Sequence, residues 1–129
     1  MSLVHVEESY FLFIKLENPL VGVGFPERGG VLALLDTGFN GFLIVPRDIY
    51  QELRLDELVP QRVKIKGVCC VREAKKYPIR VIVPDLNLSI DGEAIYFDGN
   101  EELILGTEFL SHVRLMINGC KTIGQIDIC

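Results

Sequence analysis

The stretch "VLALLDTGFNGFLIVP", residues 31–46, places a carboxylate in the middle of a strongly apolar run. Five apolar residues precede Asp36, and a second apolar run ends at Pro46. Burying an unpaired carboxylate costs several kcal/mol or makes the group hold a proton. Two roles would account for Asp36 at this position. Its side chain could cap a turn, or its carboxyl group could take part in a chemical reaction.

Length and composition describe an ordinary globular chain. The 129 residues suffice for one domain, 1–129, with a sizeable core, and 49% of them are hydrophobic against 24% charged. No apolar run is long enough to cross a bilayer, and acidic residues ahead of the first apolar stretch argue against a signal peptide. We therefore expect a cytoplasmic protein with no membrane partner.

The four cysteines do not form a metal-binding pattern. Cys69 and Cys70 are adjacent, while Cys120 and Cys129 lie near the C-terminus, so no CxxC pair occurs. The chain has only two histidines, which makes a four-ligand zinc site a poor interpretation. We expect free, mostly buried thiols, with a Cys120–Cys129 disulfide as the alternative. We expect neither a metal nor an organic cofactor.

Positive charge gathers in one segment, although the net charge is −5. Seven of the 13 Lys and Arg residues lie there, namely Arg62, Lys64, Lys66, Arg72, Lys75, Lys76 and Arg80. A solvated hairpin whose cations blunt an exposed sheet edge is the plain interpretation. A basic lid that favours acidic peptides is an alternative, whereas the acidic balance of the whole chain argues against a nucleic-acid partner.

Short β-type runs dominate the sequence. The runs that predict strands are residues 10–16, 20–25, 31–35, 42–45, 62–69, 78–84, 86–90, 93–97, 103–106, 113–117 and 122–128. Residues 62–69 and 78–84 are expected to form a hairpin, with the segment between them at its tip. The pattern therefore predicts a mainly β domain.

Turn and helix signals complete this interpretation. A short helix is expected after Pro46, and one or two helical turns are expected to start with Thr107 as N-cap. Turns are predicted at three Asx-Gly pairs, which are Asp91-Gly92, Asp98-Gly99 and Asn118-Gly119.

The Asp-Thr-Gly at residues 36–38 suits one kind of chemistry. A carboxylate can activate water for attack on an amide carbonyl, but the reaction also needs a proton donor. Two carboxylates a few ångströms apart supply both, because like charges at that distance do not both ionise easily and share one proton. Gly38 lets the backbone turn tightly, and Thr37 offers a hydroxyl that can bond across an interface.

Two segments resemble one family. "ALLDTGFNGFLIVP", residues 33–46, resembles the active-site segment of the retropepsin-like aspartic proteases, above all the small prokaryotic members. "LILGTEFLSHVRLMI", residues 103–117, resembles the second element of that family, an apolar-apolar-Gly strand followed by a short helix and a strand. The resemblance implies a closed β-barrel with a flap hairpin and one or two short helices.

The resemblance also implies an activity and an assembly. Since the chain has a single Asp-Thr-Gly, it implies a homodimer in which two symmetry-related Asp36 carboxylates activate water to hydrolyse a peptide or protein substrate. The implied catalytic residues are Asp36, Thr37 and Gly38. The implied substrate-binding residues are Phe39, Asn40, Gly41, Gly67, Val68, Cys69, Cys70 and Gly106. The alternative to this aspartic endopeptidase is a non-catalytic dimeric module that binds peptides or proteins on the same fold.

The sequence departs from the retroviral pattern at three positions. Retroviral members often pair an acidic residue with an arginine where this chain has Asn40 and Thr107. Phe39 replaces a residue that is usually small, so its ring is expected either to narrow a pocket beside the aspartates or to pack inside. These three changes put a retroviral type of substrate preference in doubt. The expected flap region departs further, because retroviral flaps are glycine-rich at the tip and this region contains the single glycine Gly67.

Overall fold

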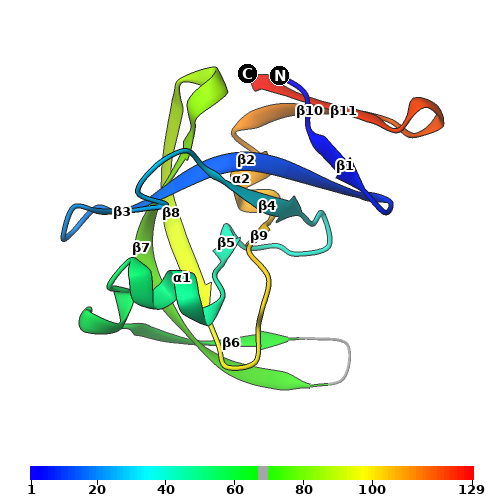
Figure 1. Cartoon of the computed structure of the whole chain (residues 1–129). Coiled ribbons are helices and arrows are strands. Elements are labelled where there is room, and N and C mark those ends of the chain that lie inside the picture. The colour runs from blue at the N-terminus through cyan, green and yellow to red at the C-terminus, as the bar shows by residue number, and fades with distance from the viewer. Residues whose placement is uncertain (67–69) are drawn as a thin grey trace.

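A computed structural model describes residues 1–66 and 70–129 of the chain (Figure 1). The strands in this part are β1 (Val4–Val6), β2 (Ser9–Asn18), β3 (Val23–Phe25), β4 (Val31–Leu35), β5 (Leu43–Ile44), β6 (Gln61–Lys66), β7 (Val71–Val83), β8 (Leu88–Tyr96), β9 (Ile104–Leu105), β10 (Val113–Asn118) and β11 (Ile123–Ile128). The helices are α1 (Arg47–Glu52) and α2 (Thr107–Leu110), with 3-10 turns η1 (Leu55–Glu57), η2 (Pro84–Leu86) and η3 (Gly119–Lys121). Neither α1 nor α2 is long enough to cross a membrane.

The main sheet closes on itself, as expected from the sequence. Its strand order is β1-β2-β4-β9-β5-β8-β7-β6, and β3 pairs with β2. The long strand β2 also pairs with β7, residues 15–17 lying opposite residues 80–82. This pairing joins β2, β4, β9, β5, β8 and β7 into a ring, beside which β10 and β11 form a separate hairpin near the two chain ends (Figure 1).

The core fills this ring because the strands alternate. Leu12, Ile14 and Leu16 of β2 point inward and are at most 1% exposed. Phe109 of α2 is fully buried and packs edge-on against Phe42, with ring centroids 5.9 Å apart. The second short helix is therefore anchored to the barrel by one aromatic side chain.

The β6–β7 hairpin is longer than expected. Strand β7 begins at Val71. It pairs with β6 residue by residue, from Gln61 opposite Lys76 to Lys66 opposite Val71. The prediction that the residues between 69 and 78 form the tip is therefore wrong for residues 71–77. These residues are strand because Ala74 and Tyr77 point inward, where they are 4% and 2% exposed.

The turn predicted at Asp91-Gly92 is wrong, since both residues lie inside β8. The Asp91 carboxylate accepts a hydrogen bond of 2.7 Å from Arg80 Nε on the paired strand β7. Gly92 lies under the ring of Phe42, where a Cβ would come within 2.4 Å of Cδ2. Cross-strand pairing and close packing therefore override the local turn signal.

One further expectation, the N-cap of the second helix, needs correction. Thr107 is the first residue of α2, and its N-cap is Gly106, without a side-chain cap. The hairpin turn predicted at Asn118-Gly119 is confirmed, since β10 and β11 pair up to Asn118 opposite Ile123. Residues 119–121 form a 3-10 turn, and Asn118 Oδ1 accepts from the Lys121 backbone N–H at 3.3 Å. The turn at Asp98-Gly99 is confirmed.

The cysteines also differ from expectation. Cys120 and Cys129 are free and exposed, so they form neither buried thiols nor a bridge with each other. Cys70, just before β7, is exposed and disulfide-bonded. The interpretation of four free, mostly buried thiols is therefore wrong.

Candidate functional site

The Asp36 loop is formed where three short strands meet. Strand β9 lies between β4 and β5, parallel to β4 and antiparallel to β5. The Leu34 N–H donates to the Leu103 carbonyl at 2.9 Å, and the Asp36 N–H donates to the Leu105 carbonyl at 3.0 Å. The loop of residues 36–42 must therefore leave β4 at the end of β9 and return to β5 on its other side.

The backbone of this loop orients the Asp36 carboxylate. The Gly38 N–H donates a 2.8 Å hydrogen bond to Asp36 Oδ1, and the Phe39 N–H donates to the Asp36 carbonyl at 3.2 Å. Asp36 itself is half-buried, whereas Thr37 and Gly38 are exposed. The loop thus holds one carboxylate oxygen in place and presents Thr37 at the surface, so the turn-capping role and a chemical role are compatible.

The same loop begins α2. The Thr107 N–H donates to the Phe39 carbonyl at 2.8 Å, and the Glu108 N–H donates to the Gly41 carbonyl at 3.1 Å. The first N–H groups of a helix have no partner within the helix. Since the loop supplies these acceptors, the Asp-Thr-Gly segment and the Gly106 segment form one interlocked unit.

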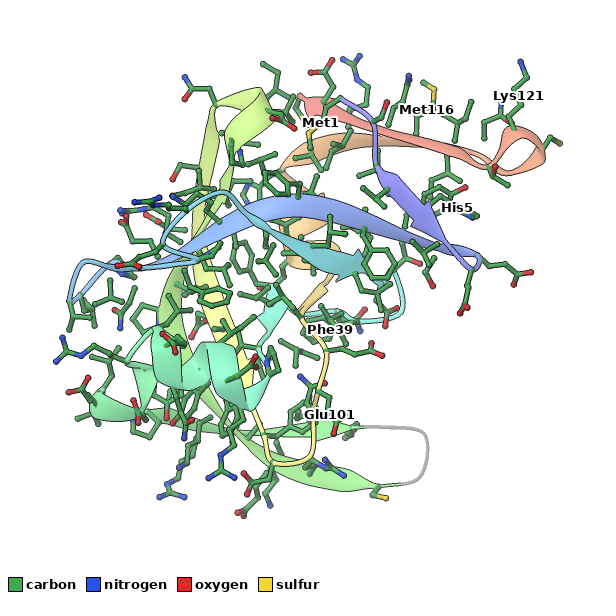
Figure 2. The ribbon with its side chains drawn as sticks, in the orientation of Figure 1. Met1, His5, Phe39, Glu101, Met116 and Lys121 are labelled. Atoms are coloured by element: carbon green, nitrogen blue, oxygen red, sulfur yellow. The ribbon has the colours of Figure 1, made fainter. Side chains whose placement is uncertain are left out.

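The ring of Phe39 fills the space above two glycines. A Cβ at Gly41 or at Gly106 would come within 2.4 Å of atoms of this ring. Phe39 also packs against a small cluster in which Ile44, Ala74 and Ile95 are buried. Figure 2 labels Phe39 at the loop between β4 and β5. Of the two expected roles of Phe39, interior packing is therefore the one observed.

Replacing Phe39 with alanine should destabilise the loop. Removing the ring leaves a gap over Gly41 and Gly106, and large-to-small changes at packed sites commonly cost about 2 kcal/mol or more. We expect the free energy of unfolding to fall by about 2 kcal/mol, measured by urea titration. The control is Val59→Ala, since Val59 is 93% exposed, and an equal loss in both variants would contradict the packing role.

The structure brings together the predicted residues Asp36, Thr37, Gly38, Phe39, Asn40, Gly41 and Gly106. Asn40 is exposed on the loop and Thr107 is half-buried, so no buried charge results from the missing acidic–arginine pair. The predicted substrate-binding residues Gly67, Val68 and Cys69 lie outside the described residues.

The cations of the hairpin do not act as one free patch. Arg80 binds Glu17 and Asp91, each at 2.7 Å, and Arg72 lies over the ring of Phe97 at 5.1 Å. Other cations line a hollow of about 410 Å³ beside the hairpin, which is bounded by Arg62, Val63, Lys64, Glu73, Ala74, Lys75, Tyr96, Phe97 and Asp98. Acidic residues interrupt this lining, so the basic lid stays a prediction.

A second hollow, of about 390 Å³, lies on the outer face of β4 next to the Asp36 loop. No residue pattern singled out above predicted this hollow. The available signal was the alternation in residues 31–35, which puts Leu32 and Leu34 on the face opposite Ala33. In the described part of the chain, no three His, Cys, Asp or Glu side chains lie close enough to hold a metal ion.

Solved structures share this architecture. A retropepsin-like aspartic protease from Rickettsia conorii matches with a TM-score of 0.68 and 12% identity, over 96% of this chain and 86% of the other. The EIAV protease, solved with the inhibitor HBY-793, matches with a TM-score of 0.58 and 18% identity, over 84% of this chain and 90% of the other. The fold is therefore the retropepsin-like fold that the sequence predicted.

A relative in sequence is an uncharacterized protein of Archaeoglobus fulgidus. It is 41% identical over 118 residues, which cover 90% of this chain and 91% of the relative. The chain therefore belongs to the same family as this archaeal protein. No family model matches the sequence.

Proposed function

We propose that this protein is an aspartic-type endopeptidase that acts as a homodimer. The observation that carries the proposal is the position of Asp36, whose Oδ1 accepts the Gly38 N–H at 2.8 Å on a loop that also exposes Thr37. The retropepsin-like fold supports it, since this fold occurs in aspartic proteases such as the one from Rickettsia conorii. The conclusion about activity rests on this loop and not on the fold alone.

The need for a second carboxylate supports the homodimer. The chain contributes one Asp-Thr-Gly, and a two-fold axis would place the same loop of a second copy opposite it. Apolar side chains on β10 and β11 are 46% to 61% exposed, namely Met116, Ile117, Ile123 and Ile128. Such exposure is typical of surfaces that another protein covers, and we place the dimer contact on this side of the molecule, with Thr37 bonding across the axis.

In the proposed mechanism two Asp36 carboxyl groups share one proton. The ionised carboxylate takes a proton from a water molecule, whose oxygen attacks the carbonyl carbon of the peptide bond. The protonated carboxyl donates its proton to the carbonyl oxygen. Collapse of the tetrahedral intermediate breaks the C–N bond, and the leaving nitrogen takes up the proton that the first carboxylate had accepted. One hydroxyl of the intermediate returns a proton to the second carboxylate as the new carboxyl group forms, so the pair again shares one proton.

Two signatures of hydrolysis test this proposal. We expect cleavage of a diverse peptide library between about pH 3 and pH 7, with a bell-shaped pH–rate profile whose two apparent pKa values belong to the carboxyl pair. The activity per polypeptide should fall when the protein is diluted below the dissociation constant of the dimer. Sedimentation measured in parallel gives the fraction of dimer.

Other outcomes separate the proposal from its alternative. A dimer that binds peptides but cleaves none of them across this pH range would favour the non-catalytic binding module. A monomer with undiminished hydrolysis on dilution would rule out the shared site.

A further inference from the structure

The hollow beside the Asp36 loop has an apolar floor. Phe11 of β2 lies directly opposite Leu34 of β4, so their side chains share one face of the sheet. Leu32 and Leu103 extend this floor, and Leu32 is 42% exposed although it belongs to a central strand. The volume of about 390 Å³ is large enough to admit one long side chain of a bound peptide.

The hollow adjoins the candidate active site along the backbone. Leu34 lies two residues before Asp36, which is about 7 Å along an extended strand. The hydrogen bond from the Leu34 N–H to the Leu103 carbonyl, at 2.9 Å, joins the two walls of the hollow. The next bond along the strand pair is the one from the Asp36 N–H. If the peptide bond to be cleaved faces Asp36, the peptide residue next to it would therefore lie over this hollow.

Two carboxylates line the hollow without a counterion. Glu7, in the turn between β1 and β2, and Glu102, just before β9, both contribute to its lining and are exposed. Among the described residues, no ion pair includes either of them, and no Lys or Arg lines the hollow. A substrate that covers these carboxylates with apolar groups would leave them desolvated and unpaired, which is unfavourable.

We propose that this hollow selects a lysine or arginine side chain of the peptide next to the cleaved bond. The aliphatic stem of such a side chain suits the floor of Phe11, Leu32, Leu34 and Leu103, and its cationic end suits Glu7 and Glu102. The proposal rests on the proposed peptidase function and specifies its substrate class. It differs from the expectation that the hairpin cations favour acidic peptides, since none of those cations lines this hollow.

A binding experiment tests this preference without requiring turnover. The full chain carrying Asp36→Asn is titrated with two labelled peptides that differ at one central position, lysine in one and norleucine in the other. The two side chains share a four-carbon stem, so the difference in affinity reports the charge. We expect the lysine peptide to bind roughly tenfold more tightly, with the advantage shrinking at high salt.

Additional variants assign the preference to the two carboxylates. Glu102→Gln and Glu7→Gln should each reduce the ratio of the two affinities several-fold, whereas Glu101→Gln should leave it unchanged. Glu101 is the matched control because it neighbours Glu102 and is exposed, but does not line the hollow; Figure 2 labels it on the connection between β8 and β9.

The outcomes separate this inference from the proposed function. Three results would each overturn the selection of a cation. They are equal affinities for the two peptides, no detectable binding of either peptide, and an affinity ratio that neither glutamine variant changes. Hydrolysis of the peptide library by the unmodified protein is measured separately. If that protein cleaves nothing while the glutamate-dependent preference persists, the peptidase proposal fails and the selection of basic side chains stands.

Discussion

Replacing Asp36 with asparagine should lower peptide hydrolysis by about 10³-fold or more while leaving the fold and the dimer intact. The asparagine side-chain oxygen can still accept the Gly38 N–H, which lies 2.8 Å from Asp36 Oδ1. The amide cannot take a proton from water or share one with the opposite chain. The loop geometry would therefore persist while both proton-transfer steps are lost, and kcat/KM for a cleaved peptide is the quantity to measure.

The control for this substitution is Asp85→Asn. Asp85 is an exposed aspartate in η2, and its loss of charge should leave kcat/KM unchanged. Sedimentation and urea unfolding of the Asp36→Asn protein show whether the dimer and the fold persist. Retained turnover in that variant would remove Asp36 from the mechanism, and loss of folding would assign it a structural role.

The core of the site could be predicted from the sequence because short local patterns determine it. Apolar residues on both sides of Asp36 require a buried strand before and after the loop. A further apolar run, which ends at Gly106, supplies strand β9, and β9 lies between β4 and β5. These patterns involve neighbouring residues, so the sequence predicts the strands, whereas the meeting of the two segments was implied by their resemblance to the retropepsin-like proteases.

The errors occurred where distant residues override a local signal. Asp91 and Gly92 have the composition of a turn, but Arg80 and the ring of Phe42 come from other strands and hold them in β8. The hollow next to Asp36 has the same origin, because Glu7 and Glu102 lie 95 residues apart in the sequence (102 − 7) and meet only in the folded chain. A single sequence contains no signal for such meetings.

Substituting Gly106 with alanine should destabilise the site more than any other single methyl group added to it. The new Cβ would lie 2.3 Å from the Gly41 carbonyl oxygen and 2.6 Å from the Phe39 carbonyl oxygen. Both oxygens accept hydrogen bonds from the start of α2, so they cannot move away without breaking those bonds. We expect the free energy of unfolding to fall by about 3 kcal/mol, measured by urea titration at a fixed protein concentration.

Two comparisons show whether backbone crowding causes this loss. Gly119→Ala is the control, because nothing lies within 4 Å of a Cβ built there, and it should change the free energy of unfolding by no more than about 0.5 kcal/mol. Adding Phe39→Ala to Gly106→Ala removes the ring contact at 2.4 Å but leaves the Gly41 carbonyl oxygen in place. The double variant should therefore remain as unstable as Gly106→Ala or more so. Full recovery in the double variant would mean that the aromatic ring, and not the interlocked backbone, requires glycine at this position.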